Sequence, residues 1–139
     1  MEITWKHSFQ QVEEILGVTD KPWIVNPFWE MDVSAQLDGK QLGDLPMEQM
    51  VQMHMMQDQP SIIDGFNFLR ERIQAGGCLH NIWDDAQRAA DPRKVQTGLY
   101  AFPVPGSKRF LLIIPGGGYF NVYSFIEGFP FARRCNALG

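Results

Sequence analysis

The sequence has few of the features that mark secreted, membrane-spanning or nucleic-acid-binding proteins. Its 139 residues contain two cysteines, Cys78 and Cys135, too few for a disulfide-stapled scaffold. No apolar run approaches the ~20 residues that span a bilayer, and the opening stretch MEITWKHSFQ lacks the regions of a signal peptide. A net charge of −4 without a basic cluster argues against nucleic-acid binding. We therefore expect a cytoplasmic protein with free thiols and no membrane or nucleic-acid partner.

Clustered metal ligands are missing as well. The three histidines are dispersed, and Cys78 with His80 supplies two ligands where a zinc site needs three or four. The methionines between Met47 and Met56 could suggest a soft-metal site, but methionine also fills cores and suits helices, and adjacent methionines point to different faces. We expect no metal and no cofactor, and methionines that pack in the core.

Apolar residues make up 45% of the chain and charged residues 20%, which is enough apolar surface for one packed domain. Ser8 and Gln11 have the spacing of a capping box, and Gly17 is placed to end the helix that they begin. Ile62, Phe66, Leu69 and Ile73 form a helical stripe that Gly76 and Gly77 terminate. The periodicity predicts helices over 8–17, 44–56, 61–75, 81–89 and 125–138, with Trp83 and Ala86 packed against the core and 18–45 as an irregular arm.

Two strands are predicted in the second half of the chain, TGLYAFPV (97–104) and RFLLII (109–114), joined by a turn at PGSK (105–108). Phe110–Ile114 shows no alternation, which is typical of a strand buried on both faces of a helix-covered sheet. The predicted fold class is therefore α/β, with a helical region over 1–90 followed by a β-β-α unit over 91–139. Direct pairing of the two strands as a hairpin, giving a small α+β domain, is the alternative.

The sequence PGGGY, Pro115–Tyr119, follows the second predicted strand. Glycines adopt dihedral angles that other residues avoid, and they let a ligand approach the backbone. Backbone N–H groups that converge at the end of a sheet suit a negatively charged oxygen. The loop matches neither a P-loop nor a GxGxxG motif, because neither a Gly-Lys-Ser/Thr ending nor a third spaced glycine is present. A plain glycine-rich turn remains the alternative to an anion site.

The stretch FLLIIPGGGYFNVYSFIEGFPFARRCNALG, residues 110–139, resembles the third strand, oxyanion loop and first helix of α/β-hydrolases of the esterase/lipase type. In the acetyl-esterase-like branch the loop often reads Pro-Gly-Gly-Gly-Tyr, as it does here, and the later S-x-x-E-G-x-P-x-A pattern at 124–132 fits the same branch. The resemblance is specific over residues 90–139, looser over 44–89 and absent before that. It implies the N-terminal portion of an α/β-hydrolase fold.

The resemblance also implies roles for the loop residues. Gly117 and Gly118 would supply oxyanion-hole N–H groups, while Gly116 would permit the turn and Tyr119 would line the acyl pocket, both as substrate-binding positions. Ser124 and Glu127 would cap and orient the following helix rather than react, since Ser124 lacks the Gly-x-Ser-x-Gly elbow of a nucleophile.

The sequence departs from that family in one respect, because it contains no Gly-x-Ser-x-Gly. The catalytic serine, acid and histidine of such enzymes follow the oxyanion loop, and the resemblance implies a further strand after Gly139 that separates the two strands seen here. We therefore expect a truncated chain: the segment of a serine esterase acting on small acyl esters that supplies the oxyanion hole and is inactive alone.

Two alternatives to the esterase segment follow from the same residues. The loop could serve a non-catalytic module that binds an anion or a carbonyl group. The unpaired apolar strand could instead recruit a second copy of the chain or a complementing C-terminal segment, because exposed strand edges invite pairing.

Overall fold

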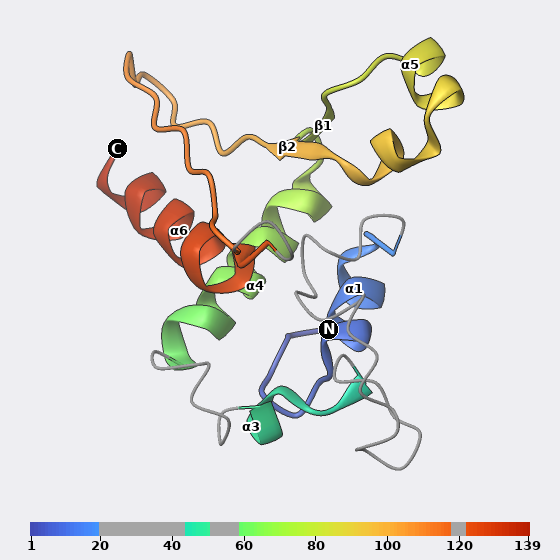
Figure 1. Ribbon diagram of the computed structural model, residues 1–139. Coiled ribbons are helices and arrows are strands. Elements are labelled where there is room, and N and C mark those ends of the chain that lie inside the picture. Colours follow the sequence, from blue (N-terminus) through green and yellow to red (C-terminus); the bar gives the residue numbers. More distant parts are fainter. Residues whose placement is uncertain (20–43, 51–58, 118–121) are drawn as a thin grey trace.

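The computed structural model describes residues 1–19, 44–50, 59–117 and 122–139. Helices and a small sheet make up this part of the chain (Figure 1). The helices are α1 (Phe9–Leu16), α3 (Met47–Met50), α4 (Gln59–Ala75), α5 (Asp85–Ala90) and α6 (Phe129–Leu138), with a 3-10 turn η4 (Pro92–Gln96) and a π-helical turn η5 (Ser124–Gly128); the strands are β1 (Leu79–Asn81) and β2 (Gly98–Tyr100). The mixed helix and strand content agrees with the α/β class at this coarse level.

Helix α1 begins and ends as the sequence predicts. The Ser8 hydroxyl accepts a hydrogen bond from the Gln11 amide at 3.2 Å, and the Gln11 side chain accepts one from the Ser8 amide at 2.9 Å. These two bonds satisfy amide groups that a helix start leaves without partners. Gly17 ends the helix in the left-handed conformation with φ 69°.

Helix α4 confirms the clearest periodic stretch and starts two residues earlier than predicted, at Gln59. Ile62, Phe66 and Leu69 are buried, and Ile73 packs against them from the rim of the core. The helix ends before Gly76 and Gly77, which both have positive φ.

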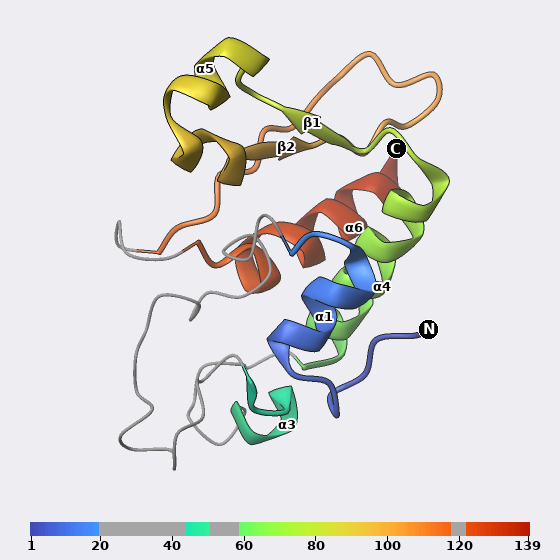
Figure 2. The same cartoon turned by 90° about the vertical axis from the view of Figure 1, so that its right-hand side faces the viewer.

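Helices α4 and α6 lie side by side (Figures 1 and 2). Their close approach depends on Gly65, where an added Cβ would lie 2.9 Å from the Pro130 nitrogen. Arg133 and Asp64 form an ion pair at 3.0 Å across this interface. The helix pair is therefore specified by a small residue at the contact and by polar groups at its edge.

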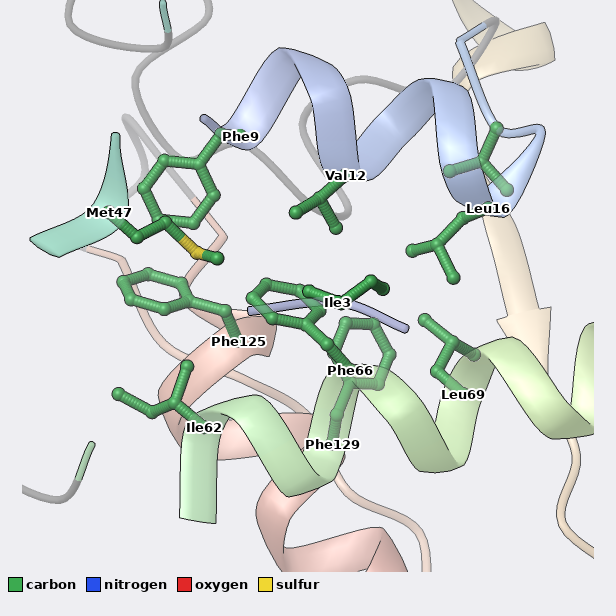
Figure 3. Close-up of a cluster of buried hydrophobic side chains, with 11 residues drawn as sticks. Ile3, Phe9, Val12, Leu16, Met47, Ile62, Phe66, Leu69, Phe125 and Phe129 are labelled. Carbon is green, nitrogen blue, oxygen red and sulfur yellow. The ribbon is translucent and has the colours of Figure 1, made fainter. Parts of the chain in front are cut away.

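The hydrophobic core lies where α1, α4, η5 and the start of α6 meet (Figure 3). The rings of Phe9 and Phe125 meet edge to face with centroids 5.2 Å apart, and Phe66 approaches Phe9 in the same way at 6.3 Å. Such aromatic pairs stabilise a core beyond their buried area. The buried cluster comprises Ile3, Phe9, Val12, Leu16, Val18, Met47, Ile62, Phe66, Leu69, Phe125 and Phe129.

The second predicted helix is confirmed at its start, because α3 begins at Met47. The Met47 side chain is fully buried in the core, as expected for a packing methionine. The remainder of that prediction, like the arm predicted over 18–45, falls largely on 20–43 and 51–58, outside the described residues.

The predicted helix over 81–89 is wrong at its beginning. Leu79–Asn81 forms β1, which pairs with β2 antiparallel in the register Leu79↔Tyr100, His80↔Leu99 and Asn81↔Gly98. The helix starts only at Asp85, because Asp84 and Gln87 form a capping box there. Helix α5 buries none of its residues, so the predicted packing of Ala86 against the core is also wrong.

The strand predicted over 97–104 is reduced to Gly98–Tyr100. The turn after it is confirmed, because the Ser107 amide donates to the Val104 carbonyl at 3.1 Å.

The buried strand predicted over 109–114 is wrong. This stretch is neither helix nor strand, and its exposed fractions reach 94% at Phe110 and 80% at Ile114. The hairpin alternative fails too, since β2 pairs with β1. An unalternating strand is buried only where a neighbouring strand and two covering layers are supplied, and the described chain places none of these around 109–114.

The final helix is confirmed in part. Helix α6 covers Phe129–Leu138, while the four residues of the prediction before it belong to the π-helical turn η5. Gly139 follows at φ 91°, where a terminating glycine was expected. Among the helices that the structure describes, none is long and apolar enough to cross a membrane.

Candidate oxyanion loop

The glycine loop connects the exposed stretch 109–114 to η5 and α6. Gly117 has a φ of 151°, a conformation that side-chain-bearing residues rarely adopt. The backbone at this position therefore requires glycine. Gly118 and Tyr119, the other predicted site residues after Gly116, lie outside the described residues.

Both backbone polar groups of Gly116, its N–H and its C=O, make hydrogen bonds. Its amide donates to Oε2 of Glu127 at 2.6 Å, and its carbonyl accepts from the Tyr123 amide at 3.0 Å. The π-helical turn η5 brings Glu127 into place, since the Glu127 amide donates to the Tyr123 carbonyl at 2.8 Å. The loop is therefore fastened to the start of the helix that follows it.

The contact between Gly116 and Glu127 joins a backbone amide to a carboxylate oxygen. Charge-assisted hydrogen bonds of this type are short and stronger than those between neutral groups. The contact agrees with the orienting role expected for Glu127. It also gives Gly116 a donor function beyond the turn, and a Cβ at this position would lie 3.0 Å from the carboxylate.

Ser124 does not cap the helix, so that expectation is wrong. The residue before η5 is Tyr123, and no side chain makes a capping hydrogen bond there. Ser124 is buried, with 7% of its surface exposed. It lies beside Gly128, where an added Cβ would meet the Ser124 Cβ at 3.4 Å and the Pro115 ring at 3.3 Å. Small side chains at Ser124 and Gly128 thus let the helix start pack against the loop.

A groove of about 1210 Å³ lies next to the loop. Its walls are the stretches 98–104 and 109–113, and residues of α6, among them Phe129 and Ala132, also line it. Pro115 and Ser124 place its end at the glycine loop. The lining is mainly apolar, and among the described residues its basic side chains, His80 and Arg109, are accompanied by no carboxylate side chain.

The thiols do not form a disulfide and differ in their surroundings. Burial raises the pKa of the Cys78 thiol, which outweighs the lowering effect of a backbone hydrogen bond and of Arg72. A protonated, buried thiol is a poor nucleophile. Among the described residues, no three histidine, cysteine or acidic side chains are grouped to hold a metal ion.

Two features of this region escape sequence reasoning. The sequence places Glu127 eleven residues after Gly116 but gives no sign that its carboxylate reaches back to that amide; the π-helical turn that achieves this has no sequence pattern of its own. The exposure of Phe110–Ile114 could not be predicted from the sequence either, since the same pattern is typical of a buried strand.

Scans of the sequence against protein-family models and against curated proteins find no match, and a search among solved structures also finds none.

Proposed function

We propose that the loop Pro115–Tyr119 binds a negatively charged oxygen and that the chain is the oxyanion-hole segment of a serine esterase or lipase-like hydrolase acting on small, acetyl-type esters. The observation that carries the proposal is the Gly116 amide, which donates to a carboxylate oxygen at 2.6 Å. Gly117 supports the proposal, because its φ of 151° is a conformation that favours glycine, the residue type expected at this position of the loop. The resemblance of residues 90–139 to the acetyl-esterase-like branch supplies the substrate class.

In this mechanism the loop stabilises charge that develops during the reaction. A serine attacks the ester carbonyl, and the N–H groups of Gly117 and Gly118 donate to the oxygen of the tetrahedral intermediate. One such donor contributes about 3 kcal/mol to the transition state. The serine, its histidine and the acid would come from a complementing C-terminal segment, because the chain has no Gly-x-Ser-x-Gly. The chain alone therefore has no turnover.

A second candidate function is a non-catalytic module that binds carboxylates or carbonyl groups. It is favoured by the same Gly116 contact, because the donor already holds a carboxylate of the chain itself, Glu127. An external carboxylate would displace Glu127 and take its place.

Acetate titration followed by amide chemical shifts in NMR tests both functions. We expect acetate to shift the Gly116 and Gly117 resonances, and to do so at lower concentration in Glu127→Gln, which removes the competing charge. Glu71→Gln, an exposed carboxylate on α4, is the matched control and should leave the titration unchanged. Gly117→Pro should abolish the response, since proline cannot adopt the required φ. No loop shift at tens of millimolar acetate, in either the wild type or Glu127→Gln, contradicts the proposal.

Binding of a tetrahedral anion separates the two functions. Wild-type chain should not hydrolyse p-nitrophenyl acetate above the buffer rate in either case. An esterase loop should bind a tetrahedral anion such as methylphosphonate more tightly than planar acetate, because the site complements the transition state. Equal or weaker binding of methylphosphonate favours the carboxylate-binding module. Turnover that a serine-directed inhibitor abolishes would show that the chain holds its own nucleophile and contradict the segment model.

A further inference from the structure

The stretch Phe110–Ile114 carries strand-forming residues without a strand partner. It is drawn out between the turn at 105–106 and Pro115 (Figure 1). Within the part of the chain that the structure describes, no hydrogen bond reaches the backbone of these five residues. Backbone groups of this kind form a ready template for pairing with another chain.

The side chains of this stretch are exposed on both of its faces. The exposed fractions are 65% at Leu111 and 61% at Leu112, next to the still higher values at Phe110 and Ile114. Because neighbouring residues of a strand point to opposite faces, each face carries exposed apolar side chains, while Ile113 alone of the five is partly buried. Contiguous apolar surface of this kind marks interaction sites in soluble proteins.

We propose that Phe110–Ile114 pairs antiparallel with the same stretch of a second copy of this chain, forming a symmetric dimer. Unpaired backbone groups call for a strand as the occupant, and the groove beside the stretch exceeds the size of an ordinary small-molecule pocket. A strand with the required apolar side chains is already present on every copy. The pairing does not depend on the oxyanion proposal, since the loop after Pro115 takes no part in it.

Full overlap of the five residues, together with twofold symmetry, fixes the register of this pairing. Leu112 lies opposite the Leu112 of the other copy, and Phe110 lies opposite Ile114, so the apolar side chains contact one another across the two strands. Such an interface is isologous and closes at two copies. Pro115, which has no N–H group, ends the ladder.

Charge favours the antiparallel direction over the parallel one. Lys108 and Arg109 precede the stretch, and parallel pairing would place these like charges opposite each other, which destabilises a sheet. In the antiparallel register each Arg109 lies about 20 Å from its counterpart, at ~3.3 Å per residue. The basic residues therefore select one orientation.

Light scattering over a concentration series tests the dimer. The wild-type chain should pass from monomer to dimer as its concentration rises. Leu112→Lys should raise the dimer dissociation constant at least about tenfold, since it places two like charges at the centre of the interface. The matched control is Ile82→Lys, which is 59% exposed in the loop between β1 and α5. It should dimerise as the wild type does. Circular dichroism establishes that both variants keep their helices.

Cysteine cross-linking tests the register. In a chain with Cys78→Ala and Cys135→Ala, Leu112→Cys should form an intermolecular disulfide on mild oxidation, because opposed residues have Cα atoms about 4.5–5.5 Å apart. Lys108→Cys, equally accessible but about 26 Å from its counterpart at ~3.3 Å per residue, should remain reduced.

Three outcomes overturn the proposal. A monomer at all concentrations does so, as does a dimer that Leu112→Lys leaves intact. Open-ended aggregates in place of a dimer do so as well, because the symmetric register closes at two copies.

Discussion

Phe66 and Phe110 are the same residue type, and their environments are opposite. Phe66 is fully buried at the centre of the core, whereas 94% of Phe110 is exposed. Phe66 belongs to a helix, which makes its own backbone hydrogen bonds and needs cover on one stripe only. Phe110 belongs to an extended stretch, whose backbone hydrogen bonds and side-chain burial would both have to come from other segments.

This contrast divides the molecule into a part whose apolar side chains bury one another and a part whose apolar side chains would need another segment to bury them. The helices α1, α4 and α6 bury one another's apolar faces, with Phe125 and Phe129 of the C-terminal region completing the core (Figure 3). In the stretch 109–114 the apolar side chains are mostly exposed, and among them only Ile113 is partly buried. Apolar composition alone therefore does not indicate burial; the source of the backbone hydrogen bonds decides it.

The largest expected effect comes from truncating Phe66, with the same truncation of Phe110 as the comparison. Phe66→Ala should lower the free energy of unfolding by about 3–5 kcal/mol, because it removes a buried ring and leaves a cavity. Phe110→Ala should change it by less than about 0.5 kcal/mol in dilute protein, where the proposed dimer is dissociated. Urea denaturation followed by circular dichroism measures both.

If Phe66→Ala lacks a cooperative transition altogether, the destabilisation is at least as large as expected. A loss above 2 kcal/mol for Phe110→Ala in the monomer would instead show that 109–114 is packed, and the contrast between the two regions would fail.

The second prediction concerns the contact between α4 and α6. Gly65→Ala should destabilise the protein by about 1–3 kcal/mol, the usual cost of overpacking. An added Cβ would lie 2.9 Å from the Pro130 nitrogen, a backbone atom that cannot move aside like a flexible side chain. In an open helix the same change would be favourable, since alanine is the better helix former. The exposed α4 variant Gln74→Ala serves as control and should stay within about 0.5 kcal/mol. A stabilising Gly65→Ala would mean that α4 and α6 do not meet closely.

The third prediction compares one motif in both parts of the molecule. Ser8 and Asp84 each begin a capping box, but α1 buries four of its residues and α5 buries none. Ser8→Ala should therefore lower the global free energy of unfolding by about 1 kcal/mol. Asp84→Ala should instead fray α5 locally, which amide hydrogen exchange of residues 85–90 detects while the global transition is unchanged. Equal global losses would show that α5 is part of the cooperative core.

Local signals explain which parts of this fold could be predicted. The capping box at Ser8, the glycines that end α1 and α4 and the stripe Ile62–Phe66–Leu69 act within one or two turns of the chain, and each is found where it was expected. The start of α5 differs from the prediction although Asp84 and Gln87 carry the same signature, because the apolar Trp83 extends the predicted helix towards residue 81. The pairing of β1 with β2 depends on contacts across 21 positions at its widest, between Leu79 and Tyr100, and three-residue strands leave almost no alternation to read.

The candidate site was predictable only in its backbone. Three consecutive glycines after an apolar run point to a loop that needs unusual dihedral angles, and Gly117 has one. The partner of the Gly116 amide could not be predicted, since Glu127 reaches it through the π-helical turn η5. Tertiary placement of a side chain, unlike a cap, has no fixed spacing in the sequence.

The smallest expected effect is electrostatic and lies outside the core, at the ion pair that follows α5. Arg93 donates to both carboxylate oxygens of Asp91 at 2.9 Å, and this side-chain hydrogen bond is the main reason that the pKa of Asp91 is lowered. A carboxyl group whose pKa falls on folding stabilises the protein above its unfolded pKa, about 3.9. That contribution is lost as the pH falls through the folded pKa.

An NMR titration of the Asp91 side-chain carbon should therefore give a pKa below the ordinary value, and Arg93→Gln should return it towards that value. Because both side chains can reach water, the accompanying change in the free energy of unfolding should be too small to detect beside that of Ser8→Ala. A pKa at or above the ordinary value in the wild type would show that the bidentate pair does not persist in solution.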